Sequence, residues 1–312
     1  MFPRNSSLKP SNIVDTSFAT WAGLTGSMKR FTTDWGAYMK KSNMLKGGTH
    51  WLTLIVATAL AFSPVASQTS AQTTANKTDK KEILTKARQS YYVLQNEGLK
   101  SFQCVIQPDW KQLLAYLMQK PVPADSPLPA KLSAVQYSAV IDEQGSVKLT
   151  PSRPAGANFD SELDQIITEG QQVVDGFFKS WVPMLVTGAF PADQDQNYDL
   201  SDQPDGYHLV QKVGDASIEL ILSKEIVLTA MKVTSSTVNV LMLPKYLKTE
   251  KGLLLTGVDT DINKGTQIVN FQVQYQTIEG FQLPDKVSYQ VTSPSYKASF
   301  DLGFTHFLLT KR

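Results

Sequence analysis

The segment QIVNFQVQYQ, residues Gln267 to Gln276, alternates apolar and polar side chains: Phe271, Val273 and Tyr275 are each separated by a glutamine. Because successive side chains of a strand point to opposite faces of a sheet, this period predicts a strand with one apolar face. The same period runs from Tyr207 to the end of the chain, in nine segments separated by turn residues. This arrangement is typical of an antiparallel meander.

The chain before Tyr207 has helical periodicity instead. The longest predicted helix spans about Asp160 to Trp181, and an earlier one begins at the capping residue Asp79 and is expected to end at Gly98. A long meander must curl, and its apolar concave face needs a cover. We therefore expect one α+β domain over residues 80–312, a half-closed barrel in which helices cover the concave face of a curved antiparallel sheet of about 8–11 strands.

One face of this predicted sheet is apolar along its whole length, and an aromatic side of the long helix is available to face it. Such a face either shelters an apolar ligand or is ordinary core, and for the helix aromatics core packing is the simpler interpretation. The candidate ligand-binding residues are Phe177, Trp181, Leu220, Leu222, Met231, Val233, Leu253, Leu255, Phe271, Val273, Tyr275, Val287 and Tyr289.

Sheltering an acyl chain needs only apolar surface. Each buried methylene contributes roughly 0.8 kcal/mol, so ten would give roughly 8 kcal/mol gross, enough for micromolar binding if ordering costs stay small. We therefore predict a non-enzymatic carrier or sensor of an acyl chain or other apolar ligand, with no cofactor. The alternative is a structural or interaction module of the cell envelope, with a fully packed core and no ligand.

Two further stretches suggest a family. A helix passes through Gly98 into a Ser-Phe strand in NEGLKSFQC, and GFQLPDKVSYQV lies near the end of the meander. This order resembles the superfamily of periplasmic lipoprotein-localisation factors. The resemblance implies a half-closed antiparallel barrel capped by helices, with acyl chains in the concavity. The chain departs from that pattern in its long helix from Asp160 to Trp181, and no residue matches the arginine of the family's acyl-release latch.

The inventory of catalytic side chains is short. Beyond residue 72 the only histidines are His208 and His306, each inside a strand pattern, and no nucleophile elbow accompanies them. Cys104, the only cysteine, alternates with Phe102 and Ile106, which predicts a small buried side chain rather than a reactive thiol. These residues favour neither a hydrolase nor a zinc site.

Two loops carry oxygen ligands at alternate positions, a spacing that suits calcium. However, the first lacks the glycine and the glutamate of a calcium-binding loop, and a hairpin turn explains the second. The weak calcium candidates are Asp193, Asp195, Asn197 and Asp199 in the first loop, and Asp259, Asp261 and Asn263 in the second.

The most apolar stretch of the chain runs from His50 to Gln72. Its core of about a dozen residues is too short for a bilayer span, which needs roughly twenty. Lysines precede it and small residues follow it, which predicts a signal peptide over 39–71 that is cleaved after Ser67 or Ala71. Residues 1–38 are then expected to be upstream sequence, or alternatively a genuine extension, and 72–79 a polar tether.

Cleavage would change the charge of the protein. Residues 1–50 contain seven Lys or Arg and two Asp, a net charge of +5, whereas the whole chain carries +2, so the remainder carries −3. A mildly acidic domain offers no electrostatic surface for nucleic acid. We therefore predict a bacterial periplasmic or secreted protein without a transmembrane span, whose partner is an apolar ligand or another envelope protein.

Overall fold

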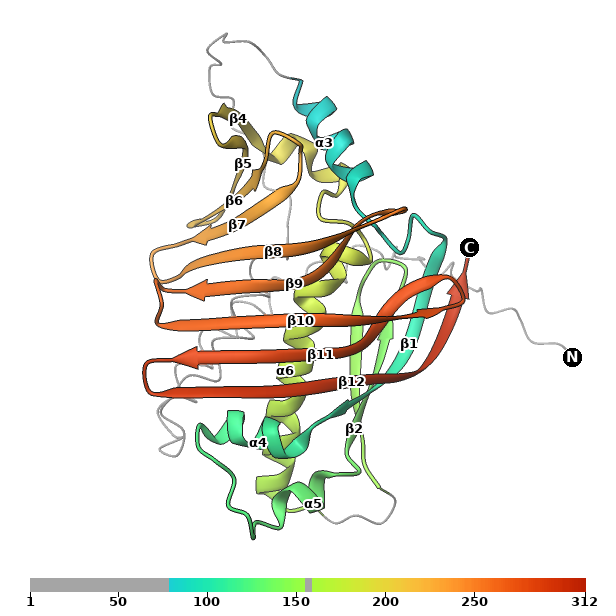
Figure 1. Cartoon of the computed structure of the whole chain (residues 1–312), viewed down its shortest axis with the longest axis vertical. Coiled ribbons are helices and arrows are strands. Elements are labelled where there is room, and N and C mark those ends of the chain that lie inside the picture. Colours follow the sequence, from blue (N-terminus) through green and yellow to red (C-terminus); the bar gives the residue numbers. More distant parts are fainter. Residues whose placement is uncertain (1–78, 155–158) are drawn as a thin grey trace, which may run out of the picture. The chain divides into compact units, whose positions relative to one another are not determined.

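A computed structural model describes residues 79–154 and 159–312, apart from the side chains of residues 193 and 194. The described chain forms one antiparallel sheet of twelve strands that does not close, together with a few helices (Figure 1). The predicted α+β class with a curved antiparallel sheet is thereby confirmed, with one strand more than the expected upper limit. The predicted signal peptide, the cleavage sites Ser67 and Ala71, the upstream sequence and most of the polar tether lie outside the described residues.

The sheet has the order β3-β2-β1-β12-β11-β10-β9-β8-β7-β6-β5-β4. Strands β5 to β12 follow one another as the predicted meander. Strand β4 precedes Tyr207 and was not predicted, and β1 joins the sheet by pairing antiparallel with β12. The strands are β1 (Leu99–Pro108), β2 (Gln136–Ile141), β3 (Val147–Ser152), β4 (Asp199–Gln203), β5 (Gly206–Val213), β6 (Ala216–Leu222), β7 (Leu228–Thr234), β8 (Asn239–Thr249), β9 (Gly252–Ile262), β10 (Gln267–Ile278), β11 (Phe281–Ser293) and β12 (Tyr296–Lys311).

The longest helix, α6, lies across one face of the sheet, behind β8 to β12 in Figure 1. We call this the inner face. Aspartate side chains cap α3, α4 and α6, each accepting a hydrogen bond from a backbone N–H of the first turn. The helices are α3 (Lys80–Ser90), α4 (Trp110–Met118), α5 (Leu128–Leu132), α6 (Ser161–Leu185) and the 3₁₀ helix η1 (Ala192–Asn197).

The first helix ends at Ser90, so the expectation that it runs to Gly98 is wrong. Hydrogen bonds to other parts of the chain replace the helical ones at this point. The Tyr92 N–H donates to the carbonyl of Leu253 at 3.1 Å, and the Tyr91 hydroxyl accepts from the backbone N–H of Leu228 at 2.6 Å. The segment after Ser90 therefore connects β7 and β9 instead of continuing the helix.

Two boundaries near prolines and glycines also differ from the prediction. Helix α6 continues past Trp181 to Leu185, with Pro183 in its last turn, where a missing N–H costs one helical bond. The last two predicted strand segments are one strand, β12. Gly303 and Phe304, at the expected break, pair in regular register with Gln107 and Ile106 of β1, and the strand bulges only after Thr305, where His306 has φ 52°.

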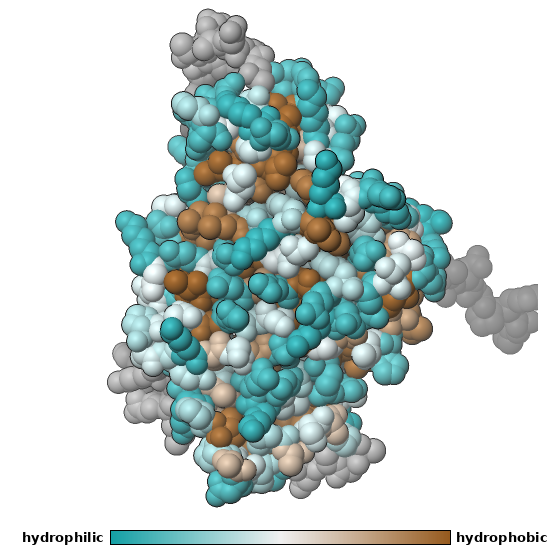
Figure 2. Space-filling model, in the orientation of Figure 1, coloured by the Kyte–Doolittle hydropathy of each residue, from teal (hydrophilic) through white to brown (hydrophobic). Residues whose placement is uncertain are grey.

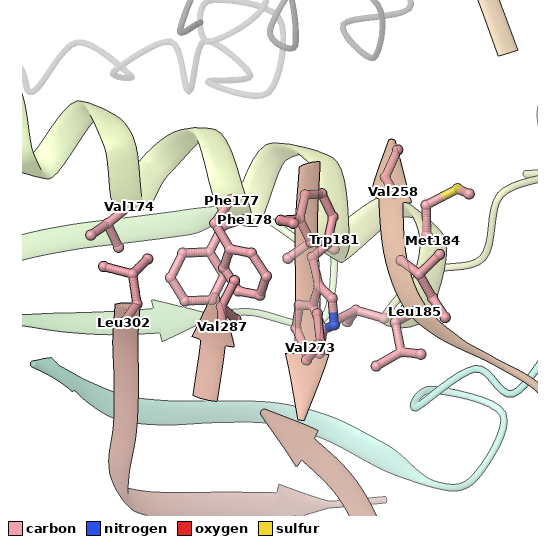
Figure 3. Close-up of a cluster of buried hydrophobic side chains, with 14 of the residues drawn as sticks. Val174, Phe177, Phe178, Trp181, Met184, Leu185, Val258, Val273, Val287 and Leu302 are labelled. Carbon is pink, nitrogen blue, oxygen red and sulfur yellow. The ribbon is translucent and has the colours of Figure 1, made fainter. Parts of the chain in front are cut away.

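The core lies between α6 and the inner face, as the close-up in Figure 3 shows. Phe177, Phe178 and Trp181 of α6 are fully buried. The rings of Phe177 and Trp181 stack with centroids 5.6 Å apart. The ring of Phe177 meets that of Phe271 on β10 edge to face, with centroids 6.0 Å apart. The helix thus fills the concavity with its own aromatic side chains.

The opposite, outer face of the sheet mixes charged, polar and apolar side chains (Figure 2). Leu243, Leu247 and Ile268 are its large exposed apolar residues on β8 and β10. Within the described ranges, no helix is long and apolar enough to cross a membrane.

Candidate functional site

The thirteen residues predicted to bind a ligand all belong to the hydrophobic core or pack against it. Eleven are buried, whereas Leu253 and Tyr275 are only partly buried. Most of them contact α6 or other strands rather than free space. The alternation therefore identified the inner face, and α6 occupies most of that face.

Part of the inner face remains open. A crevice lies between one side of α6 and the strands β8 to β12, and it has a cavity of about 40 Å³. Of the thirteen candidates, Phe271 and Tyr289 line it. Among the described residues, its lining consists of Gln172, Val173, Gly176, Ser180, Val240, Met242, Thr260, Ile262, Val269, Phe271, Tyr289 and Phe300.

The crevice is apolar and small. Its walls carry no charged side chain, and the sheet contributes mostly aliphatic and aromatic groups. A single buried water needs roughly 10–15 Å³ by this measure, and pockets for drug-sized ligands enclose roughly 300–1,000 Å³. In its present form the crevice has room for the end of an alkyl chain, and Met242, an unbranched side chain, is the wall residue best able to move aside.

Two glycines of α6 differ in what surrounds them. A Cβ added to Gly170 would lie 2.6 Å from the Tyr137 hydroxyl and 3.1 Å from the Trp110 ring, so close packing of α6, β2 and α4 requires glycine there. A Cβ added to Gly176 would meet no atom of the described residues within 4 Å. Glycine in a helix interior costs about 1 kcal/mol relative to alanine. At Gly176 no packing contact explains that cost, and the space it leaves belongs to the crevice.

Alanine substitutions at these two positions should have opposite effects. Gly176→Ala should raise the free energy of unfolding by about 0.4–1 kcal/mol, because alanine favours the helix and clashes with nothing. Gly170→Ala should lower it by about 1–3 kcal/mol, because the new methyl group overpacks a buried site. Urea unfolding of both variants measures the difference, and a destabilised Gly176→Ala would show that the space beside Gly176 is not open.

Tyr275 has a structural role at the edge of the core. Its hydroxyl donates to the carbonyl of Leu255 at 2.5 Å and accepts from the Trp181 indole N–H at 3.1 Å. Burial raises the pKa of this hydroxyl well above its ordinary value. Tyr275 therefore stays protonated and connects α6 to β9 and β10.

The most concentrated charge cluster lies on the outer face around His208. Its Nδ1 is 2.6 Å from a carboxylate oxygen of Glu219, and its Nε2 is 3.1 Å from one of Asp205. Lys232 contacts the other oxygen of Glu219 at 3.1 Å. Burial alone would raise the pKa of Glu219, but hydrogen bonds and charge from His208 and Lys232 hold that pKa below its ordinary value of 4.5. The cluster is an ion-pair network across β5, β6 and β7, and Ser201 of β4 lies opposite His208 without a hydrogen bond to it.

This network predicts an acid-sensitive contribution to stability. A carboxylate with a lowered pKa in the folded state stabilises that state above its unfolded pKa, and the contribution is lost as pH falls through the folded pKa. Wild type should therefore be more stable than Glu219→Gln at neutral pH, and the gap should close as the pH falls below 4.5. Thermal unfolding of both proteins from neutral to acidic pH measures this, and a gap independent of pH would contradict it.

The other reactive groups are structural or exposed. Cys104 is buried, and burial raises the pKa of its thiol to about 12, which disfavours the nucleophilic thiolate, as the alternation with Phe102 and Ile106 predicted. His306 is exposed, and its Nδ1 lies 2.9 Å from the Thr305 hydroxyl. Neither residue lines the crevice.

Four of the residues proposed for calcium have side-chain oxygens that are engaged within the protein. Asp195 pairs with the Arg88 guanidinium, and Asp259 accepts from Lys245 at 2.8 Å. Asp261 accepts from the backbone N–H of Gly265 at 2.6 Å, and Asn263 from that of Asn239 at 2.9 Å, as expected of a turn. Among the residues whose side chains are described, no group of three or more His, Cys, Asp or Glu is placed to hold a metal ion.

Comparisons with known proteins give no assignment: no protein-family model matches the chain, and no curated protein matches it either. The resemblance to periplasmic lipoprotein-localisation factors therefore stays a prediction.

Several crevice residues were missed at the level of sequence. Val269 shares the inner face with Phe271, and Val240 and Ile262 lie opposite each other on β8 and β9. Their period was visible, but nothing in it distinguished residues beside open space from residues in packed core. The helix carries two glycines inside its periodic pattern, Gly170 and Gly176, and the sequence does not show which of them borders open space.

Proposed function

We propose that the protein is a non-enzymatic binder of a single apolar chain, which enters the crevice between α6 and β8 to β12. The observation that carries this proposal is Gly176, where a helix glycine borders open apolar space without a packing reason. Burial of methylene groups supplies the affinity, so the walls need no reactive side chain. The positions of His208, His306 and Cys104, all away from the crevice, support a role without catalysis.

Binding would require the crevice to widen. At about 40 Å³ it accepts the end of a chain, and each further methylene has to displace Met242 or Gln172. We expect micromolar rather than nanomolar affinity, because this reorganisation offsets part of the gain from burial.

We also propose that the protein works outside the cytoplasm, in the periplasm or as a secreted protein. The apolar segment from His50 to Gln72, with lysines before it and small residues after it, supports export. A role related to lipoprotein-localisation factors is part of the same proposal, and it rests on the order of the elements.

A second candidate function is a structural or interaction module of the cell envelope. The closed core favours it, because α6 fills the concavity and the crevice is far smaller than an ordinary ligand pocket. In that case Leu243, Leu247 and Ile268 on the outer face would be the first residues to test for contact with a partner.

Uptake of a neutral fluorescent alkyl probe distinguishes the two functions. A binder should saturate with a dissociation constant of about 1–50 μM and at one probe per chain. Dodecanol should displace the probe. A protein that takes up no probe at about 100 μM would be a module without a ligand, and the proposed binding function would be rejected.

A further inference from the structure

The polar groups of the crevice are all uncharged. Its polar lining residues are Gln172, Ser180, Thr260 and, through its hydroxyl, Tyr289. The Ser180 hydroxyl is already used, since it donates to the carbonyl of Gly176 at 3.0 Å. In the described part of the chain, the side chains of Gln172 and Thr260 hydrogen-bond no other described residue. These two groups are therefore available to a bound molecule, as is the Tyr289 hydroxyl, which also hydrogen-bonds no other described residue.

Gln172 lies at the more accessible end of the crevice. Along α6 the lining residues Gln172, Gly176 and Ser180 follow one another at intervals of four, one per turn. Gln172 is partly exposed, whereas Ser180 is 7% exposed. A chain that enters tail first would place its tail near Ser180 and its polar end near Gln172.

The charges beside Gln172 do not favour an anion. Glu169, one turn earlier on the same side of α6, carries a carboxylate that accepts from Gln165 at 2.9 Å. Lys179 is paired with Asp175 at 2.5 Å and is not among the lining residues. A carboxylate placed at Gln172 would therefore lie one turn from the Glu169 carboxylate, without an unpaired cation of α6 beside it, and like charges one turn apart on a helix repel each other. An amide both donates and accepts, so it matches a hydroxyl, ester or amide group.

We infer that the ligand ends in a neutral hydrogen-bonding group, such as an alcohol, ester or amide, and that Gln172 is the residue that selects it over a carboxylate. This inference rests on the proposed function, since it concerns the ligand of the same crevice. It excludes free fatty acid anions as the preferred ligand and assigns specificity to one side chain at the end of the crevice.

The test is competition of dodecanol and dodecanoate against the fluorescent probe at about pH 8, where the free acid is ionised. Wild type should bind dodecanol at least about tenfold more tightly than dodecanoate. Gln172→Lys should strengthen dodecanoate binding at least about tenfold, because the ammonium pairs with the carboxylate, and change dodecanol binding less than about threefold. Gln172→Met, the matched control of similar size, should weaken dodecanol binding and leave dodecanoate unchanged.

The outcomes separate the two levels of the proposal. If wild type binds both molecules equally, or Gln172→Lys leaves their ratio unchanged, the crevice binds chains but Gln172 does not select them, and the inference is overturned. If wild type binds neither molecule, the proposed function itself fails and the inference fails with it. Circular dichroism of each variant shows that the fold is retained, and Gln172 is a suitable position because it is only partly buried.

Discussion

Replacing Trp181 with alanine is expected to lower the free energy of unfolding by about 3–5 kcal/mol, the largest single-residue effect on stability predicted for this protein. The indole is fully buried at the centre of the inner face, where it stacks on Phe177 and meets Phe102 edge to face with centroids 6.2 Å apart. Its N–H also donates to Tyr275. Removing the ring leaves a cavity, because α6 and the sheet can relax only partly into the empty space.

Urea unfolding followed by circular dichroism measures this effect, since the method does not depend on tryptophan fluorescence. Trp181→Phe is the matched control, because it keeps a ring in contact with Phe177. Its free energy of unfolding should fall by less than half of the decrease in Trp181→Ala. A loss below about 1 kcal/mol for Trp181→Ala would mean that α6 does not close the concavity, and the inner face would again be available to a large ligand.

Replacing Gly176 with leucine is expected to weaken binding of the alkyl probe strongly while the protein becomes more stable. Leucine favours the helix by nearly 1 kcal/mol over glycine, and its side chain extends into the open space of the crevice. The leucine side chain then covers the apolar walls of the crevice that a ligand would otherwise cover. The affinity for the alkyl probe should fall at least about tenfold, which corresponds to about 1.4 kcal/mol.

Gly176→Ala is the control for the leucine variant. Alanine stabilises the helix in the same way but adds only one methyl group to the crevice, so this variant should keep most of the affinity for the alkyl probe. Loss of binding together with gain of stability is a combination that misfolding cannot produce. Unchanged probe affinity in Gly176→Leu would place the bound probe somewhere other than the crevice.

The sheet could be predicted from the sequence because its alternation is regular. Val273 and Val287 pair across β10 and β11, both on the inner face, as a period of two requires. Leu253 shows where the period fails. A register shift between Lys245 and Tyr246 on β8 changes the pairing, and Leu254 and Leu255 are both buried while Leu253 is not. Bulges of this kind depend on the neighbouring strand and leave little trace in a single segment.

The sequence predicted that helices cover the concave face, but not how closely α6 packs against it. The apolar faces of α6 and of the sheet were both evident, but a period shows which way a side chain points and not how closely the facing surface approaches. Phe271 is the example: one side of its ring meets Phe177 in packed core, and it also lines the crevice. The distinction between core and binding surface is therefore a matter of a few ångströms between α6 and β10.

The central claim is that an apolar chain occupies the crevice beside Gly176, and native mass spectrometry of gently purified protein tests it most directly. Wild type is predicted to carry one added molecule of lipid-like mass on part of the population, and Gly176→Leu purified in the same way should carry none. Wild-type protein without any added mass, and without uptake of the neutral probe at about 100 μM, would contradict the claim.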